Sequence, residues 1–328
     1  MRCTETSSEI KLDNILYLTD FSEPADAALP FATALAREYG SSVYAVHVLR
    51  PDMYTYLAPE FGTIVTAGLE QAAKTKMQQI ESRLNGLPHQ SIIEWGTSVW
   101  STAQQVVQKN DIDLVVVGTH GRRGLQKFFL GSVAEEIWRR ASVPVLTIGP
   151  SVSRTRNGER LNCVLFVTDF TSQSLAGLPY AVAMAREYRS HLVLLHVIQQ
   201  AKADDLWEEL TAAEAIYHLS QTLPRDAKLS SRPELVIKHG EPAKGIIDTA
   251  RSCNADLIVL GVRGCDHPGI ATHDDWTIAH EVLVNATCPI LMVPGASAAL
   301  RAISTADATE MTTPLAGREV LPQPVLRG

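Results

Sequence analysis

The chain has 328 residues, of which 45% are hydrophobic and 20% are charged, and its formal net charge is −7. This length fits about two globular domains, and the negative balance provides no basic field to attract nucleic acid or an anionic membrane. The five cysteines are scattered and show no CxxC spacing, which argues against a disulfide scaffold and indicates a reducing, cytoplasmic setting. The N-terminal sequence has no signal-peptide pattern, and no apolar run is long enough to span a bilayer.

The first half alternates short apolar runs with amphipathic stretches. Continuous apolar strands that alternate with helices are typical of a parallel sheet covered on both faces, so the pattern predicts an α/β, open doubly wound domain with a five-stranded sheet. Strands are expected at Ile15–Thr19, Val43–Leu49, Ser91–Gly96, Asp113–Gly118 and Pro144–Gly149, and helices at Pro24–Gly40, about Gly68–Leu84, Thr97–Asn110 and Val133–Ala141.

The same order of segments then occurs a second time. NILYLTDFS at Asn14–Ser22 matches CVLFVTDFT at Cys163–Thr171, and DLVVVG at Asp113–Gly118 matches DLIVLG at Asp256–Gly261. The chain is therefore a tandem duplication with expected domains at residues 1–150 and 160–296. A polar linker joins them, and residues 297–328, which are rich in Ala, Thr and Pro, are expected to form a disordered tail.

The stretch GTHGRRGLQKFFLGS, from Gly118 to Ser132, follows the fourth apolar strand and precedes a helix. Gly118 and Gly121 allow a sharp turn and a close approach of the backbone to a ligand. Gly131 and Ser132 stand at a helix N-terminus, where free N–H groups and the helix dipole favour an anion. Neither the Walker pattern GxxxxGK[ST] nor the Rossmann pattern GxGxxG occurs in the chain.

The spacing Gly118-x2-Gly121-x9-Gly131-Ser132 resembles the nucleotide-binding motif of the universal stress protein family. The segments TDFS, AVHV, GTS and VPVLTI occur in the matching order. The resemblance implies two tandem domains of the adenine nucleotide alpha hydrolase-like fold and a site for ATP or a related adenine nucleotide, alone or with Mg²⁺. It also implies that the last strands, Val143–Ile148 and Pro289–Val293, pair as an intramolecular pseudo-dimer, and it leaves a homodimer of chains open.

Carried over position by position, the resemblance implies three groups of binding residues. One group lies by the base and ribose, one lines the ribose side, and one holds the phosphates, while the backbone of Val48 contacts adenine. The first group is Leu18, Thr19 and Asp20, the second is Val117 and Gly118, and the third is Gly121, Gly131, Ser132 and Val133.

Several of these residues have simpler alternative roles. Asp20 could cap the helix that starts near Pro24, and the Gly118 turn could be an ordinary strand-to-helix connection. His47 and His196 stand in apolar strands and are interpreted as buried, hydrogen-bonded histidines rather than ligands or bases. The cations of the loop could reach the phosphates or form a solvated face; they are Arg122, Arg123 and Lys127.

The second half keeps Asp169 and the first glycine turn but carries Trp276-Thr277 where the first half has Gly131-Ser132. A bulky indole and the acidic pair Asp274-Asp275 disfavour phosphate there, so this half is expected to bind ATP poorly or not at all. The same segment holds metal-capable side chains at a spacing that matches no recognised zinc pattern, so we expect a plain polar loop and no metal. These side chains are Cys265, His267, His273, Asp274 and His280.

The sequence therefore predicts an ATP-binding protein with a regulatory or stress-response role, whose nucleotide is held by the first domain. Two alternatives stay open: a slow ATPase or phosphotransfer enzyme, for which His120 is the best candidate base, and a structural adaptor that needs no nucleotide. No catalytic residue is assigned, and neither nucleic acid nor a membrane is expected as a partner. The sequence does not indicate which protein partner the chain has.

Overall fold

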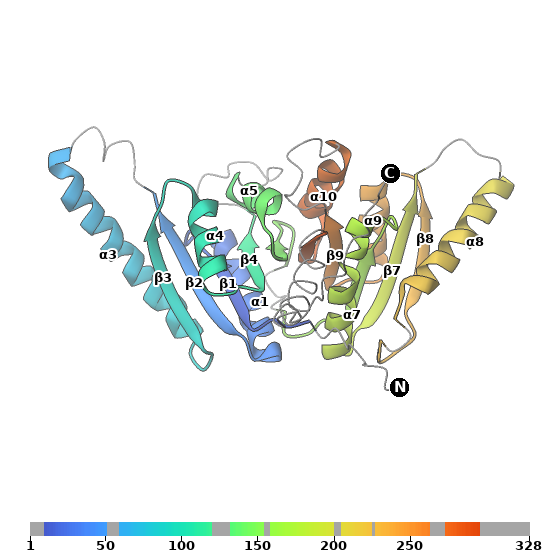
Figure 1. Cartoon of the computed structure of the whole chain (residues 1–328), viewed down its shortest axis with the longest axis horizontal. Helices are drawn as coiled ribbons and strands as arrows, with labels where there is room; N and C mark the ends of the chain where they lie inside the picture. The colour runs from blue at the N-terminus through green and yellow to red at the C-terminus, as the bar shows by residue number, and fades with distance from the viewer. Residues whose placement is uncertain are drawn as a thin grey trace, which may run out of the picture.

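The computed structural model describes residues 10–50, 59–119, 132–153, 158–199, 205–224, 227–262 and 273–295. Within them, ten strands form one sheet in the order β3-β2-β1-β4-β5-β10-β9-β6-β7-β8 (Figure 1). Each half thus contributes five strands in the same relative order, with its first strand in the centre. The expected α/β architecture of two doubly wound units is confirmed.

The first half consists of nine elements within the described residues. Its strands are β1 (Asn14–Leu18), β2 (Ser42–Leu49), β3 (His89–Trp95), β4 (Leu114–Gly118) and β5 (Val145–Ile148), and its helices are α1 (Glu23–Tyr39), α3 (Pro59–Arg83), α4 (Val99–Lys109) and α5 (Ser132–Arg140). The main difference from the expected positions is α3, which starts well before Gly68.

The second half repeats this order with one change. The counterpart of α1 is split into two helices, because the chain bends at Ala176 and Gly177 and the following helix starts at Leu178. The strands are β6 (Cys163–Val167), β7 (His191–Ile198), β8 (Glu234–His239), β9 (Leu257–Val262) and β10 (Ile290–Pro294), and the helices are α6 (Ser172–Leu175), α7 (Leu178–Glu187), α8 (Asp205–Thr222), α9 (Pro242–Ser252) and α10 (His273–Asn285).

The two halves meet at their last strands. β5 and β10 pair in antiparallel orientation through Ile290↔Thr147, Leu291↔Leu146 and Met292↔Val145, whereas all other strand pairs are parallel. An edge strand of each half is thereby covered by the other, which removes two exposed edges. The result is a single twisted sheet with the two halves arranged on either side of its centre (Figure 1).

Helices cover both faces of this sheet. Buried residues of α4, α5, α9 and α10 form one core with one face, and buried residues of α1, α3, α7 and α8 form a second core with the other face. Each core includes side chains from both halves. No helix in the described ranges combines the length and the hydropathy needed to cross a membrane.

Local sequence explains the ends of α1. The Ser22 side chain accepts a hydrogen bond from the Ala25 N–H, and Gly40 ends the helix in the left-handed conformation with φ 70°. Serine is a preferred N-cap and glycine a preferred residue after the last turn. Ser22 is therefore the N-cap of α1, and the alternative role of Asp20 as the cap is wrong.

Candidate functional site

The candidate site lies where β1 and β4 end. The chain leaves β1 for β2 on one side, whereas β4 connects to β5 on the other, so the strand order reverses between them. Ligands of open α/β sheets bind in the crevice at such a point, beyond the carboxyl ends of the strands. Leu18 is in register with Val46 of β2 and with Val117 of β4, which brings three predicted segments together.

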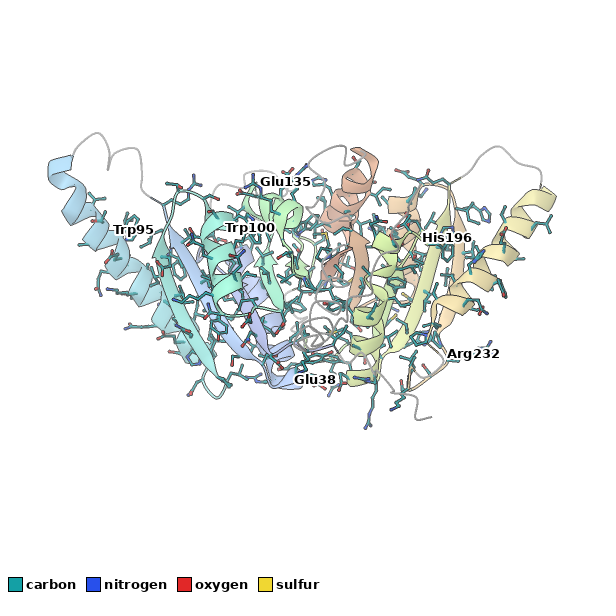
Figure 2. All side chains as sticks on the ribbon, viewed as in Figure 1. Glu38, Trp95, Trp100, Glu135, His196 and Arg232 are labelled. Carbon is teal, nitrogen blue, oxygen red and sulfur yellow. The ribbon has the colours of Figure 1, made fainter. Side chains whose placement is uncertain are left out.

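The apolar site residues present their backbones rather than their side chains to this crevice. Leu18, Val48 and Val117 are buried and belong to the core beneath α4 and α5. Trp100 of α4, labelled in Figure 2, fills the same core. The side chains of these three residues are therefore committed to the core, and only their main-chain atoms are left to meet the predicted ligand.

The main chain of Val48 points toward the end of β1. The Val46 carbonyl accepts from Thr19 N and so faces β1, whereas the Leu49 carbonyl accepts from Gly96 N and so faces β3. Successive residues of a parallel strand direct their N–H and C=O groups to alternate sides. Val48 therefore faces the β1 side like Val46 and lies beyond the last register pair of the two strands, Leu18↔Val46.

Gly118 faces the same place from the opposite side. Thr119 donates its N–H to the Ile148 carbonyl and so faces β5, which turns the main chain of Gly118 toward β1. The backbones of Val48 and Gly118 thus converge on the segment that follows Leu18. That segment carries Asp20.

A tight turn holds Asp20 in position. The Thr19 hydroxyl accepts from Phe21 N at 3.0 Å, one carboxylate oxygen of Asp20 accepts from Ser22 N at 2.9 Å, and Phe21 has a φ of 61°. These bonds fix the direction of the half-buried Asp20 carboxylate beside the start of α1. A carboxylate there can accept hydrogen bonds from hydroxyl or amino groups.

His47 contacts two residues of this turn, Thr19 and Phe21. Its Nδ1 lies 2.8 Å from the Thr19 carbonyl oxygen, to which it donates, and its ring packs on Phe21 with a centroid distance of 4.2 Å. His196 repeats the contact with the Thr168 carbonyl at 2.8 Å and with Phe170 at 4.5 Å; Figure 2 labels it on β7. Both histidines are hydrogen-bonded as predicted, although His196 is half-exposed rather than buried.

Sequence reasoning missed the partners of Phe21. The Lys76 ammonium of α3 lies 5.6 Å from the centre of the Phe21 ring, so a cation–π contact joins α3 to the turn that carries Asp20. In the second half, His218 of α8 contacts Phe170 at 5.6 Å. The repeated TDF triplet was the only sequence signal for Phe21 and Phe170. Their partners could not be identified from it, because they are distant in the chain.

Gly118 is required by packing. A Cβ atom at this position would lie 2.2 Å from the Pro24 carbonyl oxygen, so the first turn of α1 rests directly on the backbone of β4. Its φ lies outside the left-handed region, and the expected sharp turn at this residue is therefore not one that only glycine can adopt. The counterpart Gly261 has the same role, since a Cβ there would lie 2.2 Å from the Gln173 carbonyl oxygen.

The phosphate side of the predicted site is described only in part. α5 begins at Ser132, and its first N–H groups have no partners within the helix, while the half-buried Val133 packs against the core. Figure 2 labels Glu135 in this first turn, where it pairs with Arg139 at 2.9 Å. Seven further predicted or candidate residues lie outside the described residues or, for Ser132, have a side chain outside them: His120, Gly121, Arg122, Arg123, Lys127, Gly131 and Ser132.

The helix of the second half starts earlier than its counterpart. Aligned on Pro144 and Pro289, Thr277 corresponds to Ser132, yet α10 begins at His273, about one turn before. Helix boundaries vary by only one or two residues between definitions, so this difference exceeds that margin. The free N–H groups of the helix are displaced by a turn and belong to a segment with two aspartates.

Asp169 is held by its own turn. Its carboxylate accepts from the N–H and the hydroxyl of Thr171, at 3.0 and 2.6 Å. Burial alone would raise the pKa of Asp169, but hydrogen bonds from Ser174 and Thr171 outweigh it and hold that pKa below its usual range. The charged form is therefore stabilised within the protein itself.

The described residues contain no group of three or more side chains suited to hold a metal ion. The metal-capable segment of the second half falls largely outside them, including Cys265 and His267 and the side chains of His273 and Asp274. His280, on α10, is described and half-buried.

Comparison with known proteins agrees with this architecture. The sequence profile of the universal stress protein family matches residues 11–149 and 162–294. A universal stress protein of Mycolicibacterium smegmatis is 25% identical over 293 residues, which is 85% of this chain and 96% of the relative. Universal stress protein MJ0577 of Methanocaldococcus jannaschii is 27% identical over 161 residues, covering 41% of this chain and 93% of the relative.

A solved universal stress protein from Archaeoglobus fulgidus has the same fold. It covers 87% of this chain and 100% of its own length with a TM-score of 0.59, at 17% sequence identity. Both halves of the chain match the family profile, and the strand order of each half follows the same doubly wound plan. The chain therefore belongs to the universal stress protein family, of which it is a tandem two-domain member.

Proposed function

We propose that the first half binds ATP and that nucleotide occupancy gives the chain a regulatory role in stress responses. The observation that carries the proposal is the convergence of the Val48 and Gly118 backbones with the Asp20 carboxylate at the strand-order reversal. A main-chain N–H beside a C=O suits the edge of adenine, which presents an acceptor nitrogen next to an amino donor. A carboxylate suits ribose hydroxyls.

The phosphates would lie toward the start of α5. This helix connects β4 to β5, so its N-terminus lies at the carboxyl edge of the sheet, as does the end of β4. Free N–H groups and the helix dipole there favour an anion. The sequence Gly131-Ser132 has no bulky side chain, and Mg²⁺ would neutralise part of the polyphosphate charge.

In the second half, the base and ribose side is built in the same way. Val197 extends past the last register pair of β6 and β7, Val167↔Leu195, as Val48 does beyond β1. The phosphate side differs, because α10 starts a turn earlier and carries Asp274 and Asp275 in that turn. We therefore expect a single ATP per chain.

Calorimetric titration of the nucleotide-free chain with ATP tests the proposal. Gly131→Trp copies the residue of the second half and should weaken binding at least about tenfold, whereas Trp276→Gly should leave affinity and stoichiometry unchanged. Asp20→Asn should cost roughly tenfold in affinity, since hydrogen bonds to a charged group contribute about 1.5–3 kcal/mol. Asp169→Asn is its matched control in the second half.

Three results would contradict the proposal: no ATP binding, two equivalents per chain, or an affinity that Gly131→Trp leaves unchanged. Titration with cyclic AMP separates the two parts of the site, because this ligand has the base and ribose but a single phosphate charge. If ATP and cyclic AMP bind equally, the phosphate side contributes nothing. Release of phosphate during the titration would instead support the slow ATPase.

A further inference from the structure

Three cysteines of the second half gather at the amino edge of the sheet. Cys163 is the first residue of β6, Cys253 follows the last residue of α9, and Cys288 precedes β10 by two positions. Cys163 and Cys288 are buried in the core shared with α9 and α10, and the half-buried Cys253 packs against it. Segments from three parts of the chain thus bring these cysteines to the same edge of one core.

The strand register explains this arrangement. β9 lies between β6 and β10, with Val164↔Leu257 on one side and Ile290↔Ile258 on the other. One step back along β6, Asp256 N donates to the Cys163 carbonyl at 2.8 Å, and Cys163 N donates to an Asp256 carboxylate oxygen at 3.2 Å. Cys253 follows the end of α9 and precedes Asp256 by only three residues, which brings it near Cys163.

Cys163 and Cys253 lie close enough for each thiol to shift the pKa of the other. The Cys253 sulfur also lies 3.8 Å from the Ala250 carbonyl oxygen. The first half has no thiol at any corresponding position: aligned with the repeated DLVVVG and PVL segments, its residues are Asn14, Asn110 and Val143. The cluster therefore distinguishes the second half from its duplicate.

The two thiols differ in their surroundings. The hydrogen bond from Cys163 lowers the pKa of Cys253, against the effect of burial, whereas that same contact and burial raise the pKa of Cys163. Loss of a proton is therefore favoured at Cys253, which is also the more accessible of the two sulfurs. A thiolate, not a thiol, attacks an oxidant.

We propose that Cys253 and Cys163 form a peroxide-sensitive dithiol that closes to an intramolecular disulfide. The Cys253 thiolate attacks one oxygen of a hydroperoxide ROOH, the O–O bond breaks, and RO⁻ leaves and takes a proton to become ROH. The resulting sulfenic acid is attacked by the Cys163 sulfur, which loses its proton, and water leaves as the S–S bond forms. In total, two thiols are oxidised to a disulfide, and ROOH is reduced to ROH and water.

The disulfide would tie the end of α9 to the start of β6. A cross-link between residues so far apart in sequence restricts the unfolded chain and raises resistance to unfolding. Cys163 lies on β6, whereas the proposed nucleotide site lies at the ends of β1 and β4, and three strands, β5, β10 and β9, separate β4 from β6. Oxidation should therefore change stability without changing ATP affinity by more than about twofold, as expected for distant sites.

The test uses the full chain with Cys3→Ser and Cys265→Ser, so that only the three clustered thiols remain. After treatment with stoichiometric hydrogen peroxide, intact mass should fall by about 2 Da, and non-reduced peptides should show Cys163 joined to Cys253. Dithiothreitol should restore the mass, and the oxidised chain should melt several degrees higher, at roughly the scale expected for a cross-link.

Three variants separate the roles of the thiols. Cys163→Ser should leave a sulfenic acid on Cys253 that dimedone traps, Cys253→Ser should abolish the cross-link, and Cys288→Ser should retain it. A cross-link between Cys163 and Cys288, or an unchanged mass after peroxide, would overturn the proposal. So would dimedone labelling of Cys163 in place of Cys253.

Discussion

At the scale of single residues, Asp20 and Asp169 occupy equivalent positions in the two halves and can be compared directly. Both follow the central strand of their half, and both accept a hydrogen bond from the N–H two residues later. Asp169 also accepts from the Thr171 hydroxyl, and its pKa is held below the usual range against the effect of burial. Its charge is therefore coupled to the stability of the second half.

This coupling predicts a pH-dependent effect of Asp169→Asn. A carboxylate whose folded pKa is depressed stabilises the protein above its unfolded pKa of about 3.9, and the stabilisation is lost as the pH falls through the folded pKa. At pH 7 the free energy of unfolding of the variant should be about 1 kcal/mol lower than that of the wild type. The loss stays this small because solvent screens a half-exposed group. Urea unfolding from pH 7 down to pH 3 measures the gap in the free energy of unfolding between the variant and the wild type.

The gap should narrow below about pH 4. Thr171→Ser retains the hydroxyl and should follow the wild-type pH profile. A gap that stays constant at every pH would show that the charge of Asp169 contributes nothing and that only the change of side chain matters.

At the scale of elements, sequence periodicity predicted most strands and the helices between them. Buried parallel strands leave continuous apolar runs, and helix ends leave residues such as Ser22 and Gly40, so both signals are local. The start of α10 could not be predicted in this way, because polar residues of a helix's first turn resemble those of a loop. The carboxyl-end rule predicted the site at Gly118, whereas Asp20 was assigned through the family resemblance.

The packing role of Gly118 was beyond sequence reasoning for a different reason. It depends on the Pro24 carbonyl, which lies more than ninety residues earlier in the chain and meets β4 only in the folded sheet. The same holds for the Lys76 contact with Phe21. Patterns within a segment indicate which face is buried, but they do not specify which backbone atom a distant segment places against it.

The close packing at Gly118 and at Gly261 predicts a similar loss of stability in the two halves but a different effect on ATP binding. Gly118→Ala and Gly261→Ala should each lower the free energy of unfolding by about 1–3 kcal/mol, because the new Cβ meets a backbone carbonyl that cannot move alone. Only Gly118→Ala should also weaken ATP binding, since it displaces α1 at the candidate site. Urea unfolding and calorimetric titration measure the two effects.

Gly68→Ala provides the control. Gly68 lies within α3 with no heavy atom within 4 Å of an added Cβ, so alanine there should stabilise the helix by about 0.5–1 kcal/mol. If Gly118→Ala also proves neutral or stabilising, α1 does not rest on β4 as closely as described. If Gly261→Ala weakens ATP binding as much as Gly118→Ala, the nucleotide is not confined to the first half.

At the scale of the whole molecule, the two halves are joined by more than a linker. β5 and β10 complete one sheet, and both cores draw side chains from each half. The Gly149 backbone also meets the Leu283 carbonyl of α10 closely, since an added Cβ would lie 2.7 Å from its oxygen. Such sharing of core and sheet predicts that the wild type unfolds in a single cooperative transition.

Met292→Pro should abolish this cooperative unfolding of the two halves. Ile258 donates its N–H to the Pro289 carbonyl, so Pro289 faces β9, and alternation along β10 turns the N–H of Met292 toward Val145 of β5. Proline removes that donor and its ring crowds the pairing strand, at a cost of about 3 kcal/mol or more. Scanning calorimetry should then resolve two transitions, and ATP should shift only the one that belongs to the first half.

Met292→Leu keeps the N–H and nearly the same volume, so it should retain the single transition with a loss below about 1.5 kcal/mol. The distinction matters for function, because a nucleotide held by the first half can influence the second only while the two unfold and fluctuate as one body. If Met292→Pro still melts in one transition that ATP raises as a whole, the shared helical cores rather than the β5–β10 pair couple the halves. The β5–β10 pair would then protect two strand edges but would not couple nucleotide binding in the first half to the second half.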